Sequence, residues 1–220
     1  MNNKSFAVLT GDLIGYSLTK GVKREKLQNT LKDILNEIEK SFRKQKIKSK
    51  FGIYRGDSFQ GLIPDPSASL ECAIKIKSYL RSSPIKGINT IFDARIAIGI
   101  GKIDNIKRNI SESDGEAFRL SGPALDELTG QHRIKIKTPY QDLNDEFNLT
   151  CHFLDVIINR WTPAQAEVIY YLLNGLNQIS IAEALNVSQA AINQRIASAN
   201  WHTISIALKR FKKLISQKFK

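Results

Sequence analysis

The chain has 220 residues and carries 33 basic against 21 acidic side chains, for a formal net charge of +12. An apolar fraction of 42% excludes an intrinsically disordered chain, and no apolar run approaches the ~20 residues that a membrane-spanning helix needs. The two cysteines lie far apart without metal-ligand spacing, which argues against a disulfide framework and a zinc site. We therefore expect a cytoplasmic globular protein with a polyanionic partner and no membrane association.

The N-terminal part of the chain predicts short strands around one long helix. Residues 6–10 form an apolar run that ends at Gly11-Asp12. Residues 22–45 place apolar side chains three and four positions apart, which is the spacing of one helical face. Two strands are expected at 51–55 and 59–63, and the tight turn Gly56-Asp57-Ser58 joins them.

The middle of the chain continues this alternation of strands and helices. Apolar spacing predicts a helix over residues 70–80, and regular alternation predicts a strand over 93–101. A third helix is expected from about 116 to 128, and residues 134–137 and 147–157 look like short strands. The order β-α-β-β-α-β-α-β predicts an α+β fold with a ferredoxin-like core, which has an antiparallel hairpin in its middle.

Strand signals disappear after residue 158, and we place a domain boundary there. Residues 1–158 are expected to form the α+β domain, and residues 159–220 an all-α domain. Thr162-Pro163 predicts the start of the first helix of the second domain, because it combines a capping hydroxyl with proline at the first helical position. Three more helices are expected, of which the last carries a basic tail.

Two aspartates of the first domain are candidates for one metal site. Asp12 follows the first predicted strand and Asp57 lies in the hairpin turn, and a ferredoxin-like core places that strand beside the hairpin. Paired carboxylates can hold Mg²⁺ that bridges phosphate oxygens, while backbone N–H groups after the strand face the phosphates. The candidate nucleotide-binding residues are Leu13, Ile14, Gly15, Tyr16, Ser17, Arg55 and Gly56.

Residues 179–192 have the spacing of a helix-turn-helix. Ala182 is small where two helices cross, Asn186 tolerates the left-handed backbone of the turn, and Ser188 caps the second helix. The pattern resembles the winged and sigma-region-4-like helix-turn-helix families, in which glycine is usual at the position of Asn186. The resemblance implies binding of double-stranded DNA. The candidate DNA-binding residues are Ser188, Gln189, Ala190, Asn193, Gln194 and Arg195, together with Lys209, Arg210, Lys212 and Lys213 of the tail.

Residues 5–128 resemble the class III nucleotide cyclases. The segment Asp12-Leu13-Ile14-Gly15-Tyr16-Ser17 is similar to their first metal motif, and Arg55-Gly56-Asp57-Ser58-Phe59 is similar to their Gly-Asp hairpin. The segment 95–101 is similar to the strand that follows the hairpin in those enzymes. With the helix-turn-helix, the whole chain looks closest to the SatD-like bacterial family. The cyclase resemblance implies Mg²⁺ at Asp12 and Asp57 and a nucleotide triphosphate as ligand.

Two departures from the cyclase pattern concern the groups that support the transition state. Arg119 and Pro123 stand where cyclases have an asparagine and an arginine, and proline cannot replace an arginine. Arg119 is therefore the one candidate catalytic residue, and Arg55 is a stand-in for the lysine that reads the base. These departures favour binding of metal and triphosphate over cyclisation.

The combined interpretation is a bacterial DNA-binding protein that regulates transcription and whose cyclase-like domain binds a nucleotide with Mg²⁺. The alternative is an active nucleotide cyclase or nucleotidyltransferase whose helical module serves localisation or dimerisation. A third hypothesis, a metal-free scaffold for protein contacts, is disfavoured because both aspartates are retained. A homodimer is compatible with the sequence, since cyclase-like sites often form between two subunits.

Overall fold

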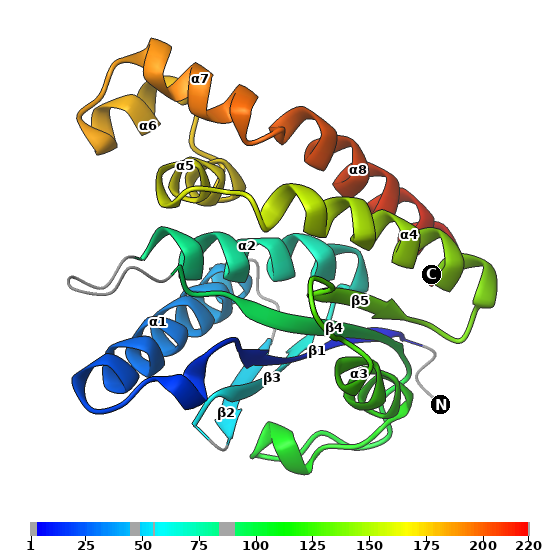
Figure 1. The fold of residues 1–220 in the computed structure, drawn as a ribbon. Helices are drawn as coiled ribbons and strands as arrows, with labels where there is room; N and C mark the ends of the chain where they lie inside the picture. Colours follow the sequence, from blue (N-terminus) through cyan, green and yellow to red (C-terminus); the bar gives the residue numbers. More distant parts are fainter. Residues whose placement is uncertain (1–3, 45–48, 55, 84–90, 220) are drawn as a thin grey trace.

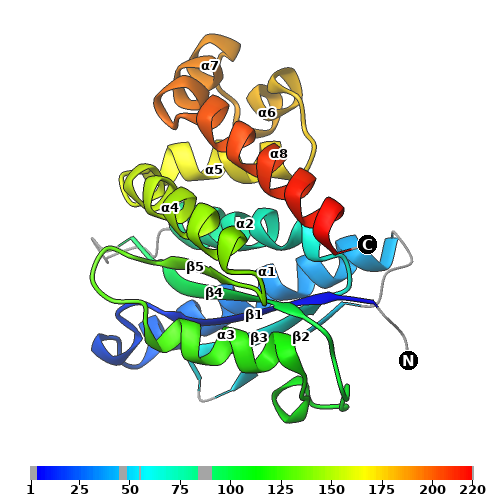
Figure 2. The same cartoon turned by 90° about the vertical axis from the view of Figure 1, so that its right-hand side faces the viewer.

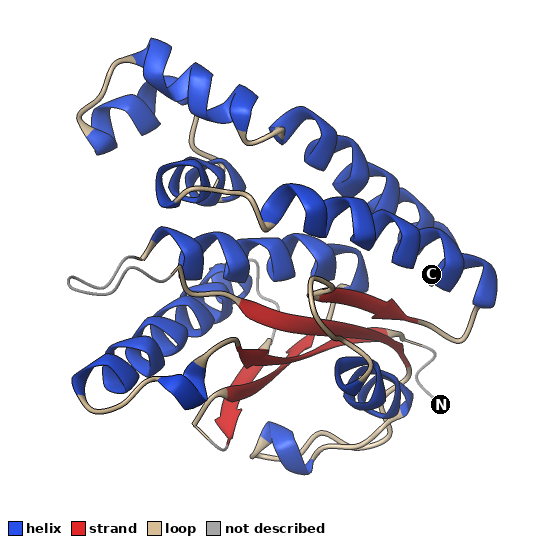
Figure 3. Cartoon of the chain, viewed as in Figure 1, coloured by secondary structure: helices blue, strands red, loops and turns tan. Residues whose placement is uncertain are grey.

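The computed structural model describes residues 4–44, 49–54, 56–83 and 91–219, so Arg55 of the predicted nucleotide site lies outside the described residues. The elements in chain order are β1 (Phe6–Leu13), the 3-10 turn η1 (Tyr16–Leu18), α1 (Val22–Lys44), β2 (Lys50–Tyr54), β3 (Ser58–Ile63), the 3-10 turn η2 (Pro66–Ala68), α2 (Ser69–Ser82), β4 (Ala94–Gly101), the 3-10 turn η3 (Ile110–Glu112), α3 (Glu116–Asp126), β5 (Ile134–Lys137), α4 (Gln141–Ile158), α5 (Pro163–Leu173), α6 (Gln178–Leu185), α7 (Gln189–Ser198) and α8 (Trp201–Lys218). Figure 1 shows their arrangement, and Figure 3 distinguishes helices from strands. None of the described helices is long and apolar enough to cross a membrane.

The strands form one sheet in the order β2-β3-β1-β4-β5. β1 pairs antiparallel with both β3 and β4, β2 pairs antiparallel with β3, and β5 runs parallel to β4. The first four strands, with α1 and α2 as their crossovers, have the order of a ferredoxin-like core. The structure thus confirms the predicted α+β fold with a helical region after it.

Helices cover both faces of this sheet. Figure 2 shows α3 below the sheet, α2 and α4 above it, and α5 and α8 above those helices. The alternation along β4 explains the two faces, because Ile96, Ile98 and Ile100 belong to the main core with α1 and α2, whereas Ala97 packs with α3. Gly99 lies on the α3 side, and a Cβ atom there would lie 2.1 Å from the carbonyl oxygen of Ala117. The close approach of α3 therefore requires glycine at this position.

The expectation of a strand at 147–157 is wrong, because these residues belong to helix α4. The buried apolar side chains of α4 from this point on, spaced four and three positions apart, are Phe147, Cys151, Leu154 and Ile158. Three large apolar side chains on the other side of the helix are exposed, namely Leu149, Phe153 and Val156. Apolar residues on both sides hide the helical period in the sequence, and the short run then looks like a strand.

The C-terminal helices share a hydrophobic cluster with the sheet and its helices. One continuous cluster of buried side chains runs from the β1 and β4 core through Trp161 to Phe211 and Ile215 of α8. The indole Nε1–H of Trp161 donates to the carbonyl oxygen of Ala199 at 3.0 Å, just after α7. The predicted boundary lies at the end of α4, and the division into two domains stays a prediction.

A buried carboxylate connects the sheet to these helices. Asp93, directly before β4, is 2% exposed and lies 2.7 Å from the ammonium of Lys77, 2.8 Å from the guanidinium of Arg81 and 2.7 Å from that of Arg133. Burial raises the pKa of the Asp93 carboxyl, but the three cations outweigh this and hold it below its ordinary value. Arg81 also donates to the carbonyl oxygens of Asn159 and Trp161, at 2.9 Å each. Asp93 therefore orients an arginine that holds the link between α4 and α5.

Replacing Asp93 with asparagine should be strongly destabilising, because it leaves buried cations without their counter-ion. We expect Asp93→Asn to lower the free energy of unfolding by about 3–5 kcal/mol at pH 7, measured by urea denaturation. The folded-state pKa of Asp93 lies below its unfolded value, so its contribution is complete above about pH 4 and is lost as the pH falls through the folded-state pKa. The difference between the two proteins should therefore shrink in acid.

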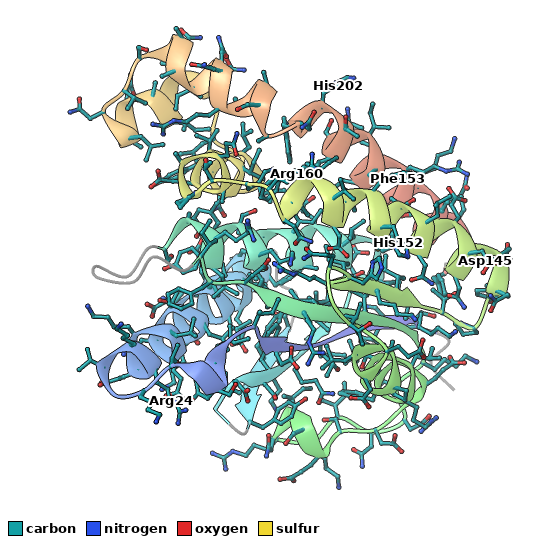
Figure 4. All side chains as sticks on the ribbon, in the orientation of Figure 1. Arg24, Asp145, His152, Phe153, Arg160 and His202 are labelled. Atoms are coloured by element: carbon teal, nitrogen blue, oxygen red, sulfur yellow. The ribbon has the colours of Figure 1, made fainter. Side chains whose placement is uncertain are left out.

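The exposed carboxylate of Asp145 on α4, labelled in Figure 4, provides the matched control. Asp145→Asn should change the free energy of unfolding by less than about 0.5 kcal/mol. A similarly small change for Asp93→Asn would show that the buried cluster does not hold the fold together.

Candidate functional site

The two sequence motifs that carry Asp12 and Asp57 meet at one edge of the sheet. β1 ends beside the β2–β3 turn, where the backbone N–H of Leu13 donates to the carbonyl oxygen of Asp57 at 3.0 Å. In the β1–β3 register Asp12 lies opposite Ser58, the residue after Asp57. The N–H of Ile14 donates to the carbonyl oxygen of Asp93 at 2.9 Å, which fixes the same loop to the start of β4. The structure thus brings together the loops that carry Asp12 and Asp57.

A glutamine from α1 connects these two loops. The side-chain amide of Gln28 donates to the hydroxyl of Tyr16 at 2.7 Å and to the carbonyl oxygen of Gly56 at 3.1 Å. Gly56 has a φ of 82°, and a Cβ atom there would lie 2.7 Å from the Tyr16 hydroxyl, so the contact depends on glycine. The guanidinium of Arg24, labelled in Figure 4, lies 4.9 Å from the ring centre of Tyr16. Tyr16 and Gly56 are therefore structural partners within the predicted nucleotide site.

The backbone of residues 13–17 is only partly available for phosphate contacts. The N–H groups of Leu13 and Ile14 are already donated to carbonyl oxygens, so the prediction fails for these two amides. Gly15 has a left-handed backbone with a φ of 76°, and the short turn η1 begins directly after it. Ser17 in that turn is exposed. The backbone N–H groups that remain candidates for phosphate contacts are therefore those from Gly15 to Ser17.

Asp12 has an arginine as its partner. Arg95 lies opposite Asp12 in the β1–β4 register, and its Nε–H donates to Asp12 Oδ1 at 2.9 Å while Nη2 donates to Asp12 Oδ2. Its third contact, from Nη1, goes to the carbonyl oxygen of Leu128 at 2.7 Å. The hydrogen bond to Asp12 raises the pKa of the Arg95 guanidinium. Both carboxylate oxygens of Asp12 therefore face a fixed positive charge.

This arrangement does not fit a divalent cation shared by Asp12 and Asp57. Unit charges 4 Å apart interact by about 4 kcal/mol at an effective dielectric constant of 20, so a doubly charged ion beside Arg95 meets several kcal/mol of repulsion. Among the described residues, no group of three or more His, Cys, Asp or Glu side chains is arranged to hold a metal ion. Because Arg95 bonds both carboxylate oxygens of Asp12, the structure gives the predicted two-aspartate Mg²⁺ site no support, and Asp12 is an ion-pair partner in this geometry.

Arg119 lies far from this edge of the sheet. α3 begins near the end of β4, where the N–H of Ala117 donates to the carbonyl oxygen of Lys102, and ends near the start of β4, where Leu128 meets Arg95. Arg119 belongs to the first turn of α3 and pairs with Asp104 at 3.0 Å and Asp114 at 2.8 Å. The candidate catalytic arginine and Asp12 are therefore at opposite ends of α3.

The second candidate region is formed by α6 and α7. Asn177 caps α6, Asn186 after it has a left-handed backbone with a φ of 51°, and the Ser188 hydroxyl accepts from the N–H of Ala191 at 3.2 Å at the start of α7. A small hydrophobic cluster of α5, α6 and α7 includes Val168, Ile181, Ala182 and Ile192. The local geometry expected at Asn186 and Ser188 is therefore present.

Most of the predicted DNA-binding side chains of the α7 region are exposed. Those that the structure leaves exposed are Ser188, Gln189, Ala190, Asn193 and Gln194, whereas Arg195 is half-buried. In the basic tail Lys209, Lys212 and Lys213 are exposed, but the guanidinium of Arg210 donates to Glu146 of α4 at 2.8 Å. Arg210 therefore helps to hold α8 against α4, and the other three lysines are the better candidates for phosphate contacts.

Sequence reasoning missed the contacts that Arg95, Asp93 and a pair of histidines make. Arg95 interrupts an otherwise apolar strand, which is a signal for a charged partner on the neighbouring strand. The rings of His132 and His152 lie 3.9 Å apart between their centres, on the loop before β5 and on α4. Their separation in sequence gives no spacing signal, because the contact depends on how α4 packs beside β5.

Comparison with known proteins gives one family match. The family model described as "SatD family" matches residues 6–214. Among solved structures, the active GGEEF domain of a diguanylate cyclase from Vibrio cholerae is similar, with 13% sequence identity and a TM-score of 0.44. The similarity covers 60% of this chain and 83% of that domain. No curated protein matches the sequence.

The cap of α7 can be tested separately from any ligand. Ser188→Ala removes the acceptor for the N–H of Ala191, so we expect the free energy of unfolding to fall by about 1 kcal/mol in urea denaturation. Ser188→Asp keeps an acceptor and should stay within about 0.5 kcal/mol of the parent protein. The exposed Ser216 lies inside α8, so Ser216→Ala is the control without a cap. Equal effects of the two alanine variants would rule out the cap.

Proposed function

The chain belongs to the SatD family, and from its two candidate sites we propose that it is a DNA-binding protein that regulates transcription in response to a nucleotide triphosphate. The single observation that carries the proposal is the exposed polar side of α7, which stands on a packed cluster of α5 and α6. The nucleotide is assigned to the edge of the sheet where the β1 and hairpin loops meet. Each part has its own test.

The geometry of α7 suits recognition of double-stranded DNA. Ile192 faces the cluster with α5 and α6, while Asn193 and Gln194 project from the opposite, exposed side. Asparagine and glutamine side chains can form paired hydrogen bonds with adenine edges in the major groove. The exposed lysines of α8 supply positive charge for phosphates, which accounts for sequence-independent affinity and its salt dependence. DNA binding would therefore bring the phosphates next to the positive charge of the C-terminal helices.

The edge of the sheet suits a phosphate chain better than a flat apolar ligand. Gly15 has no Cβ and no heavy atom within 4 Å of where one would be, so its backbone is accessible, and Ser17 two residues later offers an exposed hydroxyl. Arg24 and Arg95 provide positive charge on either side of the loop. We leave Mg²⁺ out of the proposal, because both oxygens of Asp12 accept hydrogen bonds from Arg95.

A regulatory function needs a physical connection between the two sites, and the buried Asp93 cluster offers one. The carbonyl oxygen of Asp93 accepts from Ile14 at the nucleotide edge, and its carboxylate binds Arg81. Arg81 holds the carbonyl oxygen of Trp161, whose indole donates to Ala199 at the end of α7. A ligand that shifts the loop after β1 would therefore act on groups that support α7.

The alternative of an active cyclase gains no specific support. Its one candidate catalytic residue, Arg119, pairs with Asp104 and Asp114 away from Asp12. Pro123 lies inside α3, where the cyclase pattern has an arginine.

DNA binding is tested with the full chain and a library of random duplexes. The parent protein should enrich a defined sequence and bind it with an affinity that falls steeply with salt. The double variant Asn193→Ala with Gln194→Ala should lose at least about fivefold in affinity for the enriched duplex, because each paired base contact contributes about 1–3 kcal/mol of discrimination. Its urea stability should stay unchanged, since both side chains are exposed.

The matched control replaces one asparagine and one glutamine elsewhere on the surface, Asn36 of α1 and Gln217 of α8, with alanine. This control should bind the enriched duplex like the parent protein. Absence of any duplex retardation at low salt, or an equal loss in both double variants, would contradict DNA recognition by α7.

Nucleotide binding is tested by calorimetric titration of the full chain with ATP and with GTP. Ser17→Asp places a negative charge where the phosphates are expected, and should weaken binding at least about tenfold, which corresponds to about 1.4 kcal/mol. The exposed Ser111 of η3 provides the control Ser111→Asp, which carries the same charge on another surface and should leave affinity unchanged. If Ser17→Asp and Ser111→Asp bind the nucleotide with equal affinity, the nucleotide site lies elsewhere. If neither ATP nor GTP gives a heat of binding, the proposal that the protein binds a nucleotide triphosphate is wrong.

A further inference from the structure

The partner of Asp12 is set by the register of the sheet. Arg95 is the direct cross-strand neighbour of Asp12 on β4, so both side chains project from the same face of the sheet. The guanidinium presents Nε–H and one Nη2–H to the two carboxylate oxygens, which is the paired geometry that arginine forms with carboxylates. A lysine at this position could not form both bonds at once.

A third contact holds the guanidinium in place. Nη1 donates to the carbonyl oxygen of Leu128, which lies just beyond α3 and belongs to a residue that is 2% exposed. Rotation of Arg95 away from Asp12 would break three hydrogen bonds and leave that carbonyl oxygen without this donor. The arginine is therefore anchored by two elements, β1 and the end of α3.

The Asp12–Arg95 pair offers little net negative charge to a divalent cation. Arg95 neutralises Asp12, and Asp57 on the neighbouring loop is then the other carboxylate of the predicted pair. Mg²⁺ sites in proteins usually use one or two carboxylates together with substrate phosphates. With Arg95 bonded to both oxygens of Asp12, an ion at that carboxylate would have to displace the guanidinium or lie directly beside its positive charge.

We propose that Arg95 replaces the divalent cation at Asp12, so that the site meets the phosphates of its nucleotide through a guanidinium. Arg95 uses three of its five N–H donors within the protein and is 36% exposed, so donors remain for a phosphate oxygen. Asp12 is a positioning residue that orients the guanidinium. This inference rests on the proposed nucleotide site. It adds that this site binds phosphate groups that carry no divalent metal.

The first experiment titrates Mn²⁺ alone into the full chain and follows the free ion by electron paramagnetic resonance. The parent protein and Asp12→Asn should bind Mn²⁺ equally weakly. Arg95→Met should bind it at least tenfold more tightly, and the double variant Arg95→Met with Asp12→Asn should lose that gain. Thermal unfolding checks that each variant folds. Arg95→Gln is a second variant that removes the positive charge, and it should behave like Arg95→Met.

Either of two results would overturn the inference. One is tight Mn²⁺ binding by the parent protein that Asp12→Asn weakens tenfold or more. The other is weak binding in all five proteins, because Arg95 would then not be what excludes the ion.

The second experiment titrates ATP and GTP in the presence of either EDTA or Mg²⁺. The parent protein should bind with equal affinity in both buffers, and Arg95→Met should weaken binding at least tenfold in EDTA. Binding that requires Mg²⁺ would contradict the inference but support the proposed nucleotide site. Absence of binding in both buffers would contradict the proposed nucleotide site, while the Mn²⁺ titration would still decide the partner of Asp12.

Discussion

The buried carboxylate of Asp93 is the interaction on which the arrangement of this protein depends. Three cations from two parts of the chain, Lys77 and Arg81 of α2 and Arg133 before β5, converge on one 2%-exposed side chain. Buried charges are costly to desolvate, so the cluster is stable only while every partner is present. The cluster determines how three segments are positioned relative to one another, namely α2, the start of β4 and the loop before β5.

The same cluster places the two candidate sites in one connected structure. The backbone of Asp93 holds Ile14 beside the proposed nucleotide site, and Arg81 holds the carbonyl oxygens of Asn159 and Trp161 at the start of the C-terminal helices. Side chains of α5 pack on α2, where the rings of Tyr79 and Tyr170 lie 5.1 Å apart. A rigid connection of this kind is what a nucleotide-dependent regulator of DNA binding needs, since two sites couple only through an element that both can bias.

Local sequence signals predicted most elements, and contacts between distant residues account for the main errors. Periodicity located β4 and α1, and the chemistry of Asn186 and Ser188 located the α6–α7 turn, because backbone preferences act within a few residues. The strand expected at 147–157 is wrong because α4 exposes Leu149 and Phe153 beside its buried face. The partner of Asp12 was missed for a different reason. Arg95 is 83 positions away, and only the β1–β4 register brings the two side chains together.

The measurement that tests this account most directly is hydrogen exchange of Arg81→Lys compared with the parent protein. A lysine can pair with Asp93 but cannot also hold the carbonyl oxygens of Asn159 and Trp161. The account predicts faster amide exchange at the start of α5 and at the end of α7, together with the residues at the start of β4. Faster exchange confined to α2 and β4, with α5 and α7 unchanged, would contradict a structural connection between the two sites.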